Sequence, residues 1–112
     1  MPEPMTAQDR LDVMALIAHY AQCLDGGDID GYVANFLPDG AIEWANGRAE
    51  GRDAIREWVG GLMRNGGIGA TPARVRHFAG IPDIDGDCER CSARTYVIIL
   101  SLDRDGAVAG LR

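Results

Sequence analysis

TAQDRLDVMALIAHYAQCLD, residues 6–25, has the pattern of an amphipathic helix ending on an acid, and the expected fold is built around it. At about 100° per residue, one apolar stripe is centred on Met14, and the residues within about 80° of it are Leu11, Ile17, Ala18, Ala21 and Leu24. Asp25 falls about 20° from the centre of that stripe, which directs its carboxylate toward the core. A buried carboxylate needs a partner. The alternative is a frayed last turn that exposes Asp25 to solvent.

The composition is typical of one small soluble domain. The chain has 112 residues, 46% of them hydrophobic and 25% charged, so a single domain over residues 1–112 is expected. The net charge of −6 argues against nucleic acid and anionic membrane surfaces as partners. The sequence has no apolar run of membrane-spanning length, and residues 1–10 lack the pattern of a signal peptide. These features predict a cytoplasmic protein.

Around the first helix, the sequence predicts two further helices and an antiparallel meander. Helices are expected at residues 29–37 and 52–64, and Asp28 is the expected N-cap of the first of these. The remaining segments are expected as strands at 41–45, 73–81 and 92–103, a strand starting at 107, a loop at 46–51 and a turn at 83–87. This order is typical of an α+β fold in which three helices and one curved sheet enclose an apolar pocket.

The two histidines are expected in different environments. His19 falls about 140° from Met14 on the helix, on its polar side, and is expected to be solvated. In ARVRHFAGI, residues 73–81, alternation places His77 on the face opposite to the arginines, toward the helices. His77 is then either a satisfied core histidine or the partner of Asp25. A carboxylate that accepts from one ring nitrogen leaves the other nitrogen to move a proton, which makes a general acid/base pair.

Several aromatic residues are candidates for a substrate pocket. Tyr20 lies at the edge of the apolar stripe and could donate a hydrogen bond to a substrate oxygen, or it could be an ordinary boundary tyrosine. The other aromatic side chains could line a pocket, although each is also compatible with an ordinary core: Trp44, Tyr32, Phe36, Trp58, Phe78 and Tyr96.

The sequence predicts no cofactor and no metal. The glycines at 66, 67 and 69 do not follow a strand and open a helix, so they do not form a phosphate-binding loop. Cys88 and Cys91 form a single C-x-x-C, without the second pair that completes a zinc site. Packing at a strand start is the expected role of these two cysteines, with a metal or redox site as the alternative. Lysine is absent, which excludes a Schiff base.

Four segments occur in order along the chain: YAQCLDGGDIDGY (20–32), FLPDGAIEW (36–44), GRDAIREW (51–58) and RHFAG (76–80). Together they resemble the SnoaL-like branch of the nuclear-transport-factor-2-like superfamily over almost the whole chain. The resemblance implies a cone of three helices against a strongly bent antiparallel sheet, commonly assembled as a homodimer or higher homo-oligomer through the sheet. Family members usually continue past the equivalent of Arg112 with further strands, so a sheet that is cut short or smaller is expected.

Within that superfamily, HFAG at residues 77–80 and the aspartate that ends the first helix are similar to scytalone dehydratase and bile acid 7α-dehydratase. The resemblance implies an Asp–His pair, carried over to Asp25 and His77, and an active-site tyrosine, carried over to Tyr20. It also implies loss of water from a hydroxylated cyclic substrate without a metal. Trp44 stands where the ketosteroid isomerases carry their base, so the isomerase mechanism is not expected.

Two functions from different classes stay open. The first is a cofactor-independent lyase or isomerase, dehydratase-like, that acts on a small hydrophobic cyclic molecule. In it His77 is the general acid/base, Asp25 orients His77 and Tyr20 donates a hydrogen bond to the substrate. The alternative is a non-catalytic ligand-binding or oligomerisation domain of the same fold.

Overall fold

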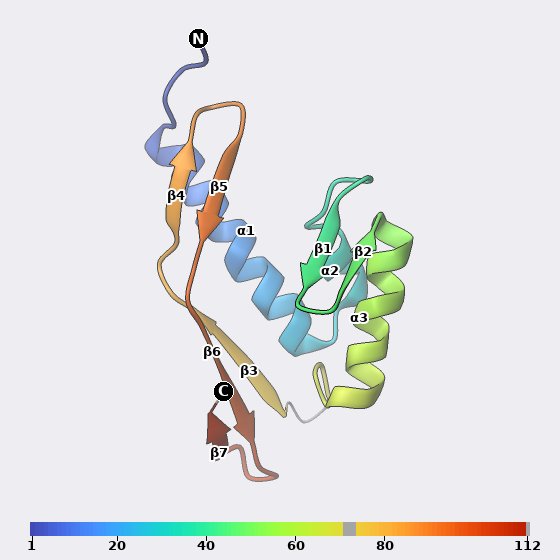
Figure 1. The fold of residues 1–112 in the computed structure, drawn as a ribbon. Coiled ribbons are helices and arrows are strands. Elements are labelled where there is room, and N and C mark those ends of the chain that lie inside the picture. Colours follow the sequence, from blue (N-terminus) through green and yellow to red (C-terminus); the bar gives the residue numbers. More distant parts are fainter. Residues whose placement is uncertain (71–73, 112) are drawn as a thin grey trace.

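The computed structural model describes residues 1–70 and 74–111, which form three helices and seven strands (Figure 1). The helices are α1 (Ala7–Gly26), α2 (Ile29–Val33) and α3 (Arg52–Gly66). The strands are β1 (Ala41–Trp44), β2 (Gly47–Glu50), β3 (Val75–Ala79), β4 (Asp83–Gly86), β5 (Cys91–Arg94), β6 (Val97–Leu102) and β7 (Val108–Leu111). The predicted α+β class is confirmed. No helix in the described ranges is long and apolar enough to cross a membrane.

The ends of α1 follow from its sequence. The Thr6 side chain accepts from the Asp9 amide, and the Asp9 carboxylate accepts from the Thr6 amide, which forms a capping box. The helix ends at Gly26 and is capped by Gly27, whose φ of 71° is left-handed. A Cβ on Gly27 would lie 2.7 Å from the Gly69 carbonyl oxygen, so glycine is needed here on two grounds. The predicted N-cap of α2 is also confirmed, since the Asp28 carboxylate accepts from the Gly31 amide.

A long bent hairpin, residues 75–102, runs beside α1 and forms the main wall of the sheet (Figure 1). Strand β3 pairs antiparallel with β6, and β4 pairs antiparallel with β5. The ladder breaks between these two pairs, where the Gly80 amide donates to the Tyr96 carbonyl over 2.8 Å and the Thr95 hydroxyl donates to the Gly80 carbonyl over 2.8 Å. This break bends the hairpin along α1. Strand β7 extends the sheet by pairing with β6.

The sheet differs from the predicted single meander. Among the described residues it consists of three separately paired pieces, β1–β2, β4–β5 and β3–β6–β7. The expected loop at 46–51 contains β2, and the expected turn at 83–87 contains β4. The expected strand at 92–103 is divided into β5 and β6 at the bend. Ala73, the first residue of the strand expected at 73–81, lies outside the described residues.

The core lies between the three helices and the β1–β2 hairpin, and its buried members are Cys23, Leu24, Tyr32, Val33, Ala49, Ile55 and Val59. Only the C-terminal half of the apolar stripe on α1 joins it. Leu11 and Met14, in the N-terminal half, are 57% and 39% exposed. Asp25, the acid that the stripe directs inward, therefore lies at the end of α1 that joins the core.

Candidate active site

The last turn of α1 and the middle of β3 bring Asp25 and His77 into contact. The Asp25 Oδ1 atom lies 2.6 Å from His77 Nδ1, and Asp25 Oδ2 accepts from the His77 backbone amide over 2.9 Å. Asp25 is only 7% exposed. The predicted pairing of these two side chains is confirmed, and the alternative of a frayed last turn is wrong.

This double contact fixes the orientation of the imidazole. An ionised carboxylate only accepts hydrogen bonds, so the proton on Nδ1 lies toward Asp25. The second carboxylate oxygen is held by the backbone of the same residue, which prevents the carboxylate from rotating away. Both oxygens of Asp25 thus have donors, which offsets the cost of burying the acid at a helix C-terminus. The ring nitrogen left for a ligand is His77 Nε2.

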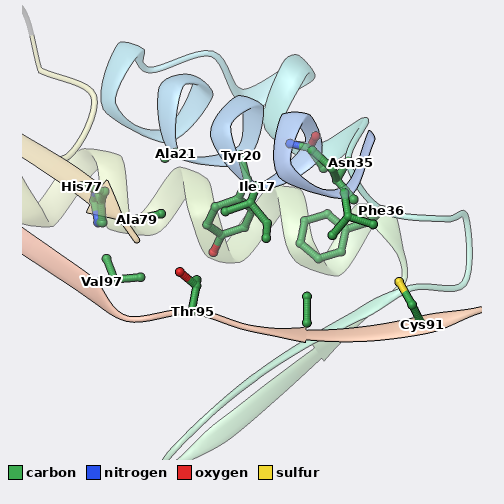
Figure 2. A pocket seen from close by; sticks show the side chains of 13 residues that line it. Ile17, Tyr20, Ala21, Asn35, Phe36, His77, Ala79, Cys91, Thr95 and Val97 are labelled. Carbon is green, nitrogen blue, oxygen red and sulfur yellow. The ribbon is translucent and has the colours of Figure 1, made fainter. Parts of the chain in front are cut away.

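A cavity of about 460 Å³ lies between α1, the segment that follows α2 and the bent hairpin, and His77 lines it (Figure 2). Its volume is within the range of small-molecule sites. Most of the wall is apolar, and it comes from Val13, Leu16, Ile17, Ala21, Phe36, Ala79, Ala93 and Val97. Figure 2 shows Tyr20 on α1 with its hydroxyl directed toward the hairpin, into the same space that His77 borders. The cavity suits an apolar ligand with few polar atoms.

Two other polar residues in the wall already use their hydrogen bonds within the protein. The Asn35 amide group donates to the Gly31 and Tyr32 carbonyls over 3.2 Å each. The Thr95 hydroxyl donates to a backbone carbonyl at the bend. Tyr20 and His77 are therefore the side chains best placed to bind a polar atom of a ligand.

The remaining predicted aromatic residues occupy different places. Phe36 lines the cavity, whereas Tyr32 lies behind Tyr20, and their hydroxyls are joined by a bond of 2.9 Å. Trp44 and Trp58 stack on each other, with ring centroids 4.9 Å apart, where β1 meets α3. These two tryptophans and Tyr32 do not line the cavity, because their elements place them in the core or at its edge.

Phe78 and Tyr96 also do not line the cavity. Phe78 directly follows the lining residue His77 in β3, and consecutive strand residues point to opposite faces. Tyr96 directly follows the lining residue Thr95 at the bend between β5 and β6. Phe78 is 56% exposed and Tyr96 is 93% exposed on the outer face of the hairpin. Side-chain alternation along the strand, counted from His77, indicates that Phe78 points away from the cavity. The same alternation along residues 91–97 indicates that Thr95 and Val97 face the cavity.

His19 is exposed, as predicted, but it also has protein partners. Its Nδ1 lies 2.9 Å from the Asn35 Oδ1, and its Nε2 lies 3.4 Å from the Cys23 Sγ. The thiol is buried, and this burial, followed by the negative charge of Asp28, raises the pKa of Cys23. A protonated, buried thiol is a poor nucleophile, so this cluster is structural.

The two cysteines of the C-x-x-C motif, Cys88 and Cys91, are both free and exposed. Within residues 1–70 and 74–111, no three His, Cys, Asp or Glu side chains are grouped so that they could hold a metal ion.

The sequence matches a known domain family. The SnoaL-like domain family matches residues 5–111. No curated protein matches the chain.

Three solved structures have the same fold. A protein of unknown function with a cystatin-like fold from Nostoc punctiforme is 26% identical, with a TM-score of 0.81 over 96% of this chain and 77% of that chain. ActVI-ORFA from Streptomyces coelicolor is 24% identical, with a TM-score of 0.76 over 91% and 76%. An NTF2-like protein with a cystatin-like fold from Novosphingobium aromaticivorans is 22% identical, with a TM-score of 0.71 over 93% and 67%.

Proposed function

The chain belongs to the SnoaL-like domain family, and on that premise we propose that it is a cofactor-independent lyase or isomerase for a small hydrophobic cyclic molecule. The observation that carries this proposal is the Asp25–His77 pair in the wall of an apolar cavity. The pair satisfies the burial of both groups and also leaves His77 Nε2 free beside the cavity. An oriented imidazole of this kind is suited to general acid/base catalysis.

The reaction that fits best is the loss of water from a cyclic β-hydroxy ketone. His77 Nε2 removes a proton from the carbon beside the carbonyl, and the electron pair of that C–H bond forms an enolate. Tyr20 donates a hydrogen bond to the carbonyl oxygen, where the negative charge develops. The enolate then re-forms the carbonyl as the C–O bond breaks, and the imidazolium returns its proton to the leaving hydroxyl, which departs as water. Asp25 stabilises the imidazolium between these two steps.

The apolar wall contributes to this chemistry in two ways. It binds the ring system of the substrate through burial of apolar surface, which is worth about 25 cal/mol per Å². It also excludes water from the developing charge, so that each hydrogen bond in the cavity is stronger than it would be in water. Both effects favour a substrate whose polar atoms are few and lie beside Tyr20 and His77.

The test is dehydration of the 3-hydroxy derivative of α-tetralone, followed by the fluorescence of the α-naphthol product. We expect turnover by the wild type and a loss of about 100-fold or more in kcat for His77→Gln, because the proton carrier is removed. Arg104→Gln is the control, since Arg104 is exposed in a turn and does not line the cavity. Equal rates for wild type and His77→Gln would contradict the proposal.

A second candidate, an assembly domain, is favoured by the outer face of the bent hairpin. Phe78 and Ile98 lie directly opposite each other on this face, and Leu111 lies opposite Leu100 further along it. Phe78, Ile98 and Leu111 are all exposed. An exposed apolar patch of this kind is typical of a protein interface. For this candidate we propose that the face packs against the same face of a second copy, in a two-fold arrangement, and sedimentation of the wild type at increasing concentration tests it.

A further inference from the structure

The phenol of Tyr32 is buried directly behind the proposed site. Its residue is 0% exposed, and its hydroxyl donates to the Tyr20 hydroxyl over 2.9 Å. The ring of Tyr32 also packs on Tyr20, with centroids 4.8 Å apart, and on Phe36, with centroids 5.6 Å apart. Tyr32 therefore contacts two residues of the cavity wall without lining the cavity.

The hydrogen bond between the two hydroxyls has a direction. Tyr32 is 0% exposed, and among the described residues the Tyr20 oxygen is the acceptor within reach of its hydroxyl, so the Tyr32 proton has no partner unless it is donated to Tyr20. Burial, and next this hydrogen bond, also raise the pKa of Tyr32. A hydroxyl carries one proton, and that of Tyr32 is donated to the Tyr20 oxygen. The proton of Tyr20 must then point away from Tyr32. The open side of Tyr20 is the cavity (Figure 2).

Tyr32 is itself held in place by the ends of α2. Asp28 caps the start of the helix by accepting from the Gly31 amide. Asn35 binds the Tyr32 carbonyl from the other end, and His19 holds Asn35 by a 2.9 Å bond. The polar cluster around His19 thus helps to hold the helix that carries Tyr32.

We propose that Tyr32 is a positioning residue that directs the Tyr20 proton into the cavity, so that the site selects a cyclic ligand carrying an oxygen acceptor. This inference rests on the role given to Tyr20 in the proposed function, but it concerns binding and does not require turnover. It makes ligand preference depend on a residue that the ligand does not touch.

The experiment compares two ligands of nearly equal shape, α-tetralone, which has a ketone oxygen, and tetralin, which lacks it. Calorimetry on the wild type is expected to show about five- to tenfold tighter binding of α-tetralone, the usual effect of one hydrogen bond. Tyr20→Phe is expected to abolish this preference. Tyr32→Phe is expected to reduce it at least threefold while tetralin binds as in the wild type, because the ring and its packing are kept. Tyr96→Phe removes an exposed hydroxyl and is the matched control.

The double variant Tyr20→Phe/Tyr32→Phe shows whether Tyr32 acts through Tyr20. We expect it to bind α-tetralone as Tyr20→Phe does, with no further loss. A further loss would overturn the inference, as would an unchanged ketone preference in Tyr32→Phe or an equal weakening of both ligands. If the ketone preference behaves as expected but the hydroxy ketone is not dehydrated, the inference stands and the proposed lyase activity fails.

A crystal structure of the wild type with α-tetralone gives a test that does not depend on the folding of any variant. The ketone oxygen is expected within hydrogen-bond distance of the Tyr20 hydroxyl, with the Tyr32–Tyr20 bond intact. A ketone oxygen bound elsewhere in the cavity would overturn the inference.

Discussion

On the inner face of the bent hairpin, His77 lies among apolar neighbours with its side chain 11% exposed. On the outer face, the next residue, Phe78, stands opposite Ile98, and both are exposed. Most sheets with one solvated face have the reverse arrangement, with polar residues outside and apolar residues inside. His77 can lie on the inner face because Asp25 satisfies its hydrogen bonds. No comparable contact in the described part of the chain explains the exposed apolar side chains of the outer face.

The two faces of the hairpin therefore differ in how the described residues cover them. The inner face is completed within the chain, by the end of α1, where Asp25 binds His77 in the cavity wall. The outer face is apolar and exposed in the described part of the chain, and this is the observation behind the proposed packing against a second copy. Substitutions on the two faces should change different properties, and the expected loss of stability is greatest at Asp25 and least at Phe78.

Asp25→Ala is expected to destabilise the protein most. It leaves both the His77 ring N–H and the His77 backbone amide without their acceptor. Breaking a buried pair in this way costs about 3–5 kcal/mol in the free energy of unfolding, measured by urea denaturation. Asp30→Ala is the control, because Asp30 pairs with Arg56 at the surface, where an ion pair is worth about 1 kcal/mol or less. A loss for Asp25→Ala no larger than that of the control would show that the inner face does not depend on the pair.

The Asp25–His77 pair could be predicted from the sequence for a physical reason. The helical period directs one acid inward, the strand period directs one histidine inward, and neither group is stable in an apolar core alone. Few other titratable groups are directed toward the core, so each is the expected partner of the other. The SnoaL-like resemblance led to the same pair by an independent route.

Other parts of the fold carried too little signal. Strand β2 contains one buried apolar residue, Ala49, and β4 contains one apolar residue, Ile84, so neither shows the alternation that predicts a strand. Both form because a neighbouring strand pairs with them. The number of aromatic residues in the cavity wall was overestimated, because composition gives the number of aromatic side chains but not the face of the helix or strand that carries each one. The contact of Tyr32 with Tyr20 depends on how α2 packs on α1, which neither helix encodes alone.

Tyr32→Phe tests the region behind the inner face through its pH dependence. Below about pH 10 the phenol of Tyr32 is protonated in both the folded and the unfolded chain, so it adds no pH dependence. Above that pH the unfolded chain releases the proton while the folded chain, in which the pKa of Tyr32 is raised by burial, retains it. Unfolding is then favoured, and the wild type loses up to about 1.4 kcal/mol per pH unit from this group.

Denaturation curves between about pH 9 and pH 11 measure this loss. The wild type is expected to lose stability more steeply than Tyr32→Phe as the pH rises, while the exposed control Tyr96→Phe follows the wild type. Parallel curves for wild type and Tyr32→Phe would mean that the phenol is not protected behind the cavity.

Phe78→Thr is expected to change stability least and to have a clear effect on assembly. Phe78 is more than half exposed and threonine keeps a good strand propensity, so the monomer should change by about 0.5 kcal/mol or less. If the outer face packs on a second copy, each dimer contains two substituted side chains, and sedimentation should show at least about tenfold weaker self-association. Leu37→Thr, at an exposed apolar position outside the hairpin, should associate as the wild type does. Because Phe78 points away from the cavity, α-tetralone binding should stay unchanged, and a variant that loses ligand binding together with association would show that the two faces are not independent.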